Sequence, residues 1–292
     1  MALPFYIVNA FTTNPYGGNP AGVVLLKEPL ETEILQQIAK NFNQPMVSFI
    51  WPVAEDLSHD PRSAIFNIRW FNASLEVPLC GHASLATAGA LFALNLLPPM
   101  VNTVRFQTTT GRVVSASRTG DWVELSLAAA TTRVPSQDEV DRLTKITRRG
   151  LGKDVTVNYV GIGGEGFESY VMVEIDQADD LAGCKPDPGA FLETGYTVNI
   201  VTSSSSDSDV NFVSRMFAPA ASATIPEDPV CGSAHCLLTP YWAHKLDLND
   251  APMVAKQVSE RGGDLRVRWR GPEKLISLGG QSRITMKGDL LL

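Results

Sequence analysis

The sequence has little of what marks a protein that binds nucleic acid or anionic membranes. Among its 292 residues, 24 Lys and Arg stand against 31 Asp and Glu, which gives a formal net charge of −7. No basic run is longer than the pair Arg148-Arg149. Because such partners are held mainly by basic surfaces, we expect neither nucleic acid nor membrane as a partner.

Long uninterrupted apolar runs are also missing. The most apolar stretch, residues 83–101, contains Asn95 and the pair Pro98-Pro99, and we interpret it as a buried core helix and its exit rather than a membrane span. The N-terminal residues up to Asn9 carry no basic segment of the kind that opens a signal peptide. These features predict a cytoplasmic protein.

Cysteine is scarce, and its spacing matches no zinc motif. The four cysteines are Cys80, Cys184, Cys231 and Cys236. Small disulfide-stabilised proteins are much richer in cysteine, and zinc sites usually take pairs of closely spaced ligands. We therefore expect reduced thiols and no metal site.

What the sequence does have is one block that occurs twice. Residues 76–82 read Glu-Val-Pro-Leu-Cys-Gly-His, and residues 227–233 read Glu-Asp-Pro-Val-Cys-Gly-Ser. Each block follows an Arg-X-Phe triplet, which begins at Arg69 in the first copy and at Arg215 in the second. One block in each half of a chain of this length predicts two similar lobes.

The pattern of apolar residues predicts many short strands and one strongly apolar helix in each half, at residues 81–94 and 232–244. This pattern is typical of an α+β fold with two pseudo-symmetric lobes, each a mixed, curled β-sheet wrapped around a central α-helix. We expect lobes at residues 1–125 and 126–280, with a last strand at about 281–292 that can return to the first lobe.

Other segments are predicted as ordinary parts of such a fold. Amphipathic helices are expected at residues 31–41 and 137–147. The glycine-rich residues 161–166 join two strand patterns and are interpreted as a hairpin loop, and the polar residues 203–209 as a surface loop. His59 and His244 are interpreted as surface residues.

Cys80 and Cys231 each stand at the predicted start of an apolar helix. The partial positive charge of unpaired helix amides would lower the pKa of a thiol there and favour the thiolate. The alternative is that both are small buried core residues, although their matched positions in the two copies favour a function. The duplicated acids, Glu76 and Glu227, are interpreted either as charges that stabilise the helix N-termini or as braces of the loops.

The residues next to these cysteines predict a binding site for an anionic ligand. Gly81 and Gly232 would let a carboxylate approach the first helix amides, although they also suit close packing of helix and strand. His82 can shuttle a proton near neutral pH. Asp228 can accept a proton, and Ser233 can hydrogen-bond a ligand.

Several blocks resemble, in order, the PhzF-like family of phenazine biosynthesis. They are residues 9–11, 18–21, 76–84, 227–235 and 259–265, and they span nearly the whole chain. The family is similar in fold to diaminopimelate epimerase and proline racemase. The resemblance implies two lobes with an active site between them, no cofactor, and a homodimer. It places Asn19, in the second block, among the substrate-binding residues.

The resemblance also assigns roles to individual residues. It implies that His82, Asp228, Gly81, Gly232 and Ser233 surround a carboxylated substrate. The sequence departs from the family in one respect that matters for the reaction. The proton-shuttling acid of the family is a glutamate, and here the corresponding block, residues 44–49, has Met46 in its place.

A thioether neither donates nor accepts a proton at ordinary pH, so the glutamate-dependent isomerisation is not expected from Met46. Cys80 and Cys231, by contrast, stand where the related epimerases and racemases have their two thiols. The resemblance therefore favours a two-base mechanism, in which one thiolate removes a proton and the opposite thiol returns one.

The leading hypothesis is a cofactor-independent isomerase or epimerase of a small carboxylate-bearing metabolite. A PhzF-type double-bond isomerase that uses Asp228 or His82 as the base is a second hypothesis. A third is a binding or interaction protein that has kept the fold and lost the chemistry, because Met46 replaces the usual acid.

Overall fold

The computed structural model describes residues 2–53 and 60–292. The interpretation of His59 as a surface residue lies outside the described residues, whereas His244 is exposed, as expected. The chain divides into two compact units. Unit 1 comprises Met1–Leu127 and Leu278–Leu292, and unit 2 comprises Ala128–Ser277.

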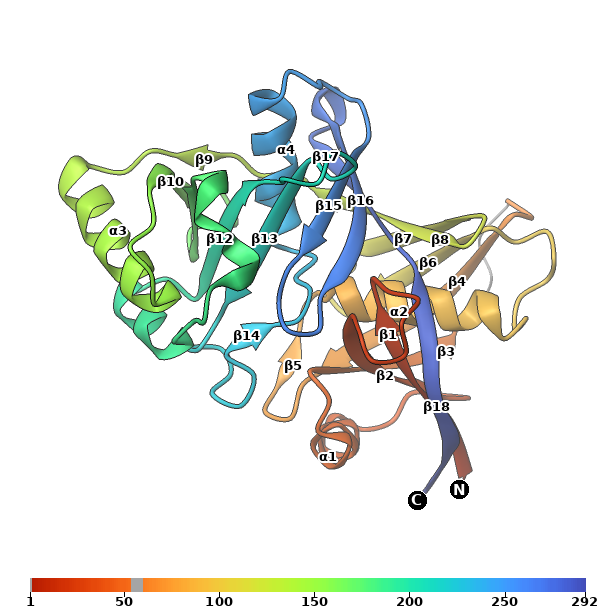
Figure 1. Cartoon of the computed structure of the whole chain (residues 1–292). Coiled ribbons are helices and arrows are strands. Elements are labelled where there is room, and N and C mark those ends of the chain that lie inside the picture. The colour runs from red at the N-terminus through yellow and green to blue at the C-terminus, as the bar shows by residue number, and fades with distance from the viewer. Residues whose placement is uncertain (1, 54–59) are drawn as a thin grey trace. The chain divides into compact units, whose positions relative to one another are not determined.

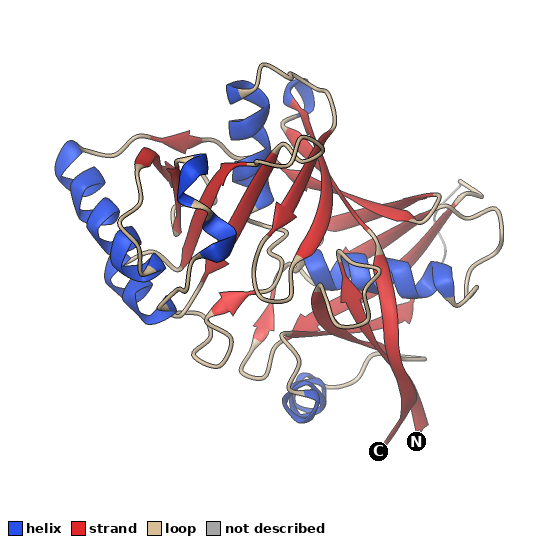
Figure 2. Cartoon of the chain, viewed as in Figure 1, coloured by secondary structure: helices blue, strands red, loops and turns tan. Residues whose placement is uncertain are grey.

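Unit 1 consists of strands and two helices (Figures 1 and 2). Its strands are β1 (Ala2–Ala10), β2 (Asn19–Leu25), β3 (Met46–Pro52), β4 (Ser63–Phe71), β5 (Glu76–Val77), β6 (Thr103–Thr108), β7 (Val113–Thr119), β8 (Trp122–Ala128) and β18 (Ser282–Leu291). Its helices are α1 (Thr32–Phe42) and α2 (Gly81–Ala93).

Unit 2 has more helical segments. Its strands are β9 (Thr132–Arg133), β10 (Val157–Gly163), β11 (Tyr170–Ile175), β12 (Val198–Ser204), β13 (Phe212–Phe217), β14 (Glu227–Asp228), β15 (Met253–Gln257), β16 (Gly263–Arg270) and the first half of β17 (Leu275–Gly280). Its helices are α3 (Gln137–Leu151) and α4 (His235–Lys245), with 3₁₀ turns η1 (Gln177–Asp179), η2 (Leu181–Gly183), η3 (Pro188–Thr194) and η4 (Gly271–Glu273).

The two units repeat one strand order. In unit 1, β1 and β2 are antiparallel, β2 and β3 parallel, β3 and β4 antiparallel, β4 and β6 parallel, and β6 and β7 antiparallel. In unit 2 the same sequence of pairings runs through β10, β11, β12, β13, β15 and β16. Short β5 and β14 pair with the ends of β4 and β13 in the same way. The repeat that the sequence shows in one block thus extends over a whole sheet.

Helix α2 is the core of unit 1. Residues 82–92 are all buried, and the helix packs against β1, β2, β3, β7 and β18. Gly89 is required where the helix passes β18, because a Cβ there would lie 2.0 Å from the Ser282 hydroxyl oxygen. A helix that is apolar on all sides is buried on all sides, and the sheet accordingly wraps around it. The predicted fold class is confirmed.

Helix α4 is the counterpart of α2 in unit 2 and contains Pro240 in its interior. A proline removes the amide that would bond the carbonyl four residues earlier. That carbonyl, of Cys236, accepts a hydrogen bond from the Ala130 amide at 2.9 Å instead. The proline is tolerated because the freed oxygen has a partner in the segment before β9.

Some predicted elements differ from the structure. Helix α4 begins at His235 rather than Gly232, because residues 232–234 form a tight turn in which the His235 amide donates to the Gly232 carbonyl at 3.1 Å. Strand β12 was not predicted, and Ser203 belongs to it rather than to a surface loop. Its buried Asn199, Thr202 and Ser203 hide the apolar pattern of a strand.

Candidate active site

The duplicated acids, Glu76 and Glu227, brace the two loops that carry Cys80 and Cys231. These loops are called the cysteine turns below. In unit 1, the Arg69 guanidinium donates to both carboxylate oxygens of Glu76, at 2.8 and 2.6 Å. In unit 2, Arg215 donates to both oxygens of Glu227 at 2.7 and 2.8 Å. A two-point contact between guanidinium and carboxylate fixes orientation as well as distance. Of the two interpretations of these acids, the structure supports loop bracing.

Cys80 is the N-cap residue of α2, and its sulfur has a histidine partner. The Sγ atom lies 3.3 Å from Nδ1 of His82. Both side chains are buried, and burial lowers the pKa of His82 to about 4, with a backbone interaction at Pro20 partly opposing the shift. The imidazole is therefore neutral near pH 7, and its nitrogen can take part in hydrogen bonds with the thiol.

Cys231 has the matching contact in unit 2, with a hydroxyl in place of the imidazole. Its Sγ atom lies 3.3 Å from the Ser233 hydroxyl oxygen, which accepts a hydrogen bond from the Tyr170 hydroxyl at 3.0 Å. Burial is the main reason why the pKa of the Cys231 thiol is raised, and the nearby charge of Asp228 adds to the shift. The expectation of a lowered thiol pKa is therefore wrong for Cys231, which is a neutral thiol at neutral pH.

The Cys231 turn is held by a residue far along the chain. The Cys231 amide donates to the side-chain oxygen of Gln257 at 2.8 Å, and the Gln257 side-chain amide donates to the Asp228 carbonyl at 2.5 Å. The Ser259 hydroxyl donates to the Pro229 carbonyl at 2.6 Å. Ser259 lies in a block that carries the family resemblance, but nothing in the sequence alone indicates that Gln257 bridges the two ends of this turn.

Asp228 lies directly before the turn. It ends β14, and its side-chain oxygen Oδ1 accepts a hydrogen bond from the Val230 amide at 3.2 Å. The structure thus brings Asp228, Cys231, Gly232 and Ser233 together on one loop. Gly232 begins the turn before α4 rather than the helix itself.

Met46 and Asn19 begin neighbouring parallel strands of unit 1. Met46 is the first residue of β3 and pairs with Ala21 of β2, whereas Asn19 is the first residue of β2. Both are buried, and α2 packs against both strands. His82 interacts with the backbone of Pro20, which places it beside the start of β2.

The four cysteines all lie among the described residues, and each is a buried, reduced thiol. Cys236 is in the interior of α4, as expected for a core residue. The Cys184 sulfur donates to the Asp180 carbonyl at 3.5 Å, away from the cysteine turns.

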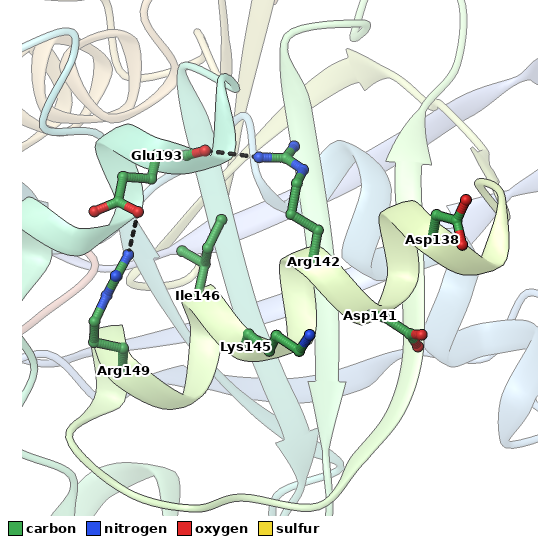
Figure 3. Close-up of a pocket in the computed structure, with 7 residues that line it drawn as sticks. All are labelled: Asp138, Asp141, Arg142, Lys145, Ile146, Arg149 and Glu193. Carbon is green, nitrogen blue, oxygen red and sulfur yellow. Dashed lines mark hydrogen bonds and ion pairs between the residues drawn. The ribbon is translucent and has the colours of Figure 1, made fainter.

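A surface hollow of about 500 Å³ lies elsewhere in unit 2, between α3 and η3. Figure 3 shows its charged side chains, and two of them are paired: Arg142 donates to the Glu193 carbonyl at 2.7 Å, and Arg149 contacts the Glu193 carboxylate at 2.6 Å. No residue of the predicted site lines it. Because its arginines already have partners, the hollow is an ordinary charged surface.

No helix among residues 2–53 and 60–292 is long and apolar enough to cross a membrane. The cytoplasmic location and the homodimer that the sequence led us to expect stay predictions.

Residues 8–288 match the family model described as phenazine biosynthesis-like protein, PhzC-PhzF. The chain belongs to this family. The relatives of this PhzF-like protein include an uncharacterized isomerase of Halalkalibacterium halodurans, which is 33% identical over 292 residues and covers 100% of both chains. The predicted membership is confirmed.

Solved structures agree with this assignment. A PhzF-family protein of Enterococcus faecalis has a TM-score of 0.83 at 30% identity, with 100% of each chain covered. A hydroxyproline epimerase of Agrobacterium vitis has a TM-score of 0.63 at 10% identity, covering 100% of this chain and 93% of that one, which shows the fold alone. Because its relatives are named isomerases, the protein is an isomerase-class enzyme with an epimerase-like fold, which favours the two enzyme hypotheses over that of a binding protein.

Proposed function

We propose that this PhzF-like protein isomerises or epimerises a small carboxylate-bearing metabolite without a cofactor. In the proposed reaction, a proton leaves the carbon next to the carboxylate and another is returned, and each of the two cysteines carries one of these transfers. The observation that carries the proposal is the duplicated contact: in each unit, a cysteine sulfur lies 3.3 Å from a polar side-chain atom two residues further on.

The substrate carboxylate would bind at the backbone of these turns. The first amides of an α-helix have no acceptor within the helix, and they favour an anion. Gly81 is the first residue of α2 and directly follows Cys80. Hydrogen bonds to a carboxylate held there would become stronger as negative charge spreads into it from the neighbouring carbon. They would therefore stabilise the transition state more than the bound substrate.

The two thiols would have different roles in one direction of the reaction. The raised pKa of the Cys231 thiol keeps it protonated at neutral pH, so it is the group that holds a proton to return to the substrate. Cys80 lies 3.3 Å from the neutral imidazole of His82, which can hydrogen-bond its sulfur, and we assign Cys80 as the group that removes the proton. In the reaction the C–H bond breaks as the Cys80 S–H bond forms, and the Cys231 S–H bond breaks as the new C–H bond forms.

Replacement of Cys80 and Cys231 singly by alanine tests this proposal. The probe is a panel of small carboxylic acids with an acidic C–H next to the carboxylate, incubated in D₂O and followed by NMR. We expect the wild-type protein to introduce deuterium at that carbon in at least one acid, and each variant to lose 99% or more of the rate, about 3 kcal/mol of transition-state stabilisation.

Cys184→Ala is the matched control, because Cys184 is a buried thiol of unit 2 outside the cysteine turns. It should keep the full exchange rate. Unchanged exchange in both Cys80→Ala and Cys231→Ala would overturn the proposed roles of the thiols.

One observation favours a second candidate, the double-bond isomerase in which Asp228 is the base. Because the pKa of the Cys231 thiol is raised, that thiol is a poor base at neutral pH, whereas a carboxylate on the same loop can accept a proton. His82 or the thiols would then serve only to bind the substrate.

Asp228→Asn separates the two candidates. Under the second candidate, this variant loses activity by about 100-fold or more while Cys80→Ala and Cys231→Ala stay active. Asp250→Asn is the control, because it removes an exposed carboxylate of unit 2 that pairs with Arg268. It should leave the activity unchanged. Under the thiol mechanism the order of effects is reversed.

A further inference from the structure

The two cysteine turns follow matching pairs of strands and differ in chemistry. Cys80 has an imidazole nitrogen at 3.3 Å, and Cys231 has a hydroxyl oxygen at the same distance. The hydroxyl in turn accepts a hydrogen bond from Tyr170, the first residue of β11. At the corresponding place of unit 1, the side chain two residues after Cys80 is the imidazole of His82 in place of a hydroxyl.

The register of the sheets shows what stands at the corresponding place of unit 1. Tyr170 pairs with Val198 at the start of β12, and Ala21 pairs with Met46 at the start of β3. These two pairs occupy matching positions, because β12 and β3 pair in the same register with the Arg-X-Phe strands that follow. Ala21 is therefore the counterpart of Tyr170, and a methyl group cannot donate a hydrogen bond.

A serine hydroxyl has one hydrogen to donate. When Tyr170 donates to the Ser233 oxygen, the Ser233 hydrogen is free to be donated to the Cys231 sulfur 3.3 Å away. The backbone of Ala234 also lowers the pKa of this thiol. Donors that point at a sulfur stabilise its thiolate form, and hydrogen bonds in a chain strengthen one another.

We propose that Tyr170 is a positioning residue that, through Ser233, aims a hydrogen-bond donor at the Cys231 sulfur and so fits this thiol for releasing a proton to the substrate. The inference rests on the proposed function for its meaning in the reaction, but the hydrogen-bond chain is tested without it. The chain stabilises the thiolate that remains after Cys231 has given up its proton.

Other groups change the pKa of the Cys231 thiol or hold the Cys231 backbone in place. Asp228 and burial favour the neutral thiol, and Cys236 adds a small effect in the same direction. His235 Nδ1 donates to the Cys231 carbonyl at 2.8 Å, and Gln257 accepts from the Cys231 amide, so both hold its backbone.

The ring of Tyr170 is held independently of its hydroxyl. It packs edge-on against Phe167 of the β10–β11 hairpin with ring centroids 5.0 Å apart. Replacement by phenylalanine therefore removes the hydrogen bond and keeps the packing. Burial raises the pKa of Tyr170 to about 12, so the phenol carries its donor hydrogen throughout the neutral and mildly alkaline range.

The test is the alkylation of Cys231 by iodoacetamide in the folded full-length protein between pH 7.5 and 10, followed peptide by peptide with mass spectrometry. Only the thiolate reacts. We expect Tyr170→Phe to slow alkylation of Cys231 about threefold at each pH, and Ser233→Ala to slow it about tenfold, as expected for loss of one hydrogen bond to a charged group.

The direction of the change separates positioning from a merely structural effect. Loosened packing would expose the buried thiol and speed its alkylation, whereas loss of the donor slows it. Tyr159→Phe is the matched control, because its hydroxyl is bonded to Thr132 at 2.7 Å and not to the cysteine turn. It should leave the rate unchanged.

The outcomes for the hydrogen-bond chain and for the proposed function are independent. Equal or faster alkylation of Cys231 in Tyr170→Phe overturns the chain, whatever the exchange measurements show. Full deuterium exchange in the two cysteine variants overturns the proposed roles of the thiols in the reaction, whatever the alkylation rates show. Under the thiol mechanism, Tyr170→Phe should also lower kcat with little change in KM, because the thiolate forms only during the reaction.

Discussion

Arg69 and Arg215 hold in place the two loops that carry Cys80 and Cys231. Arg215 and Glu227 are the more deeply buried pair, with 6% and 17% of their side chains exposed, against 13% and 30% for Arg69 and Glu76. Arg215 also donates to the Cys184 carbonyl at 2.9 Å. Each guanidinium lies over the phenylalanine of its own triplet, so the Arg-X-Phe repeat is a structural device that sets where each cysteine loop leaves its strand.

Buried histidines make the stability of the fold depend on pH. Burial lowers the pKa of His82 and His235 from 6.5 to about 4. Below about pH 6.5 the unfolded chain binds protons that the folded chain excludes, so the free energy of unfolding falls as the pH drops from 6.5 towards 4. Above pH 6.5 both states are neutral at these positions and the effect is absent.

The prediction concerns His235→Asn, whose amide can replace the Nδ1 donor to the Cys231 carbonyl without titrating. Urea unfolding followed by tryptophan fluorescence should show a smaller loss of stability between pH 7.5 and 5 than in the wild type, by roughly 2 kcal/mol. His244→Asn changes an exposed histidine and should keep the wild-type loss. Parallel curves for His235→Asn and wild type would contradict the pKa shift.

At the residue scale, the sequence predicts those parts of the site whose residues are close together in the chain. Cys231, Gly232 and Ser233 are found as one block, and so are Cys80, Gly81 and His82. Tyr170 and Gln257 are not found, because they reach the turn from positions far away in the sequence. The raised pKa of the Cys231 thiol was also missed, since burial depends on the whole fold and outweighs the effect of nearby amides.

At the scale of elements, α4 is held to β11 at both of its ends. Tyr170 contacts the turn before the helix, and Glu174 contacts its last turns. Glu174 is buried and accepts a hydrogen bond from Tyr241 at 2.5 Å, and it also contacts the Lys245 ammonium. A buried carboxylate needs such partners, because without them it would be strongly destabilising.

Tyr241→Phe should therefore weaken the attachment of α4. Burial and Glu174 raise the pKa of Tyr241, so the phenol remains a donor at all ordinary pH values. Its removal should cost about 1–3 kcal/mol and speed hydrogen exchange of the α4 amides, measured by mass spectrometry.

Tyr196→Phe serves as the control for this variant. Its hydroxyl lies 3.5 Å from a Glu139 carboxylate oxygen on α3, so little energy should be lost. Unchanged exchange in α4 of Tyr241→Phe would show that Lys245 alone satisfies Glu174.

The elements that the sequence predicts well are those with one dominant pattern. Helix α2 is found because its run of alanine, leucine and glycine lacks charge, and it ends within a residue of the expected place. Strand β12 was missed because polar residues occupy buried positions. Thr202, for example, donates to the Val213 carbonyl at 2.7 Å and accepts from the Trp242 ring nitrogen at 3.0 Å. Such partners are visible only in three dimensions.

At the scale of the whole molecule, unit 1 is built from both ends of the chain. Strand β1 pairs with β18 along its full length, from Ala2 and Leu291 to Ala10 and Ser282, and the termini lie side by side (Figure 1). The first residues of the chain therefore stay without a partner on one side until the last residues have been made. The sequence led us to expect a last strand that can return to the first lobe, but its pairing with β1 joins distant segments, and no local pattern specifies that register.

Deletion of residues 282–292 should turn β1 into an exposed edge strand. Leu3, Ile7 and Val8 are buried in β1, and α2 also loses its contacts with β18. An apolar edge strand with unpaired backbone groups promotes association between chains. We expect a lower urea midpoint and concentration-dependent oligomers in size-exclusion chromatography. Deletion of Leu291 and Leu292 alone, which are 80% and 52% exposed, should change neither. Wild-type behaviour of the longer deletion would mean that β1 needs only β2 to hold its place in unit 1.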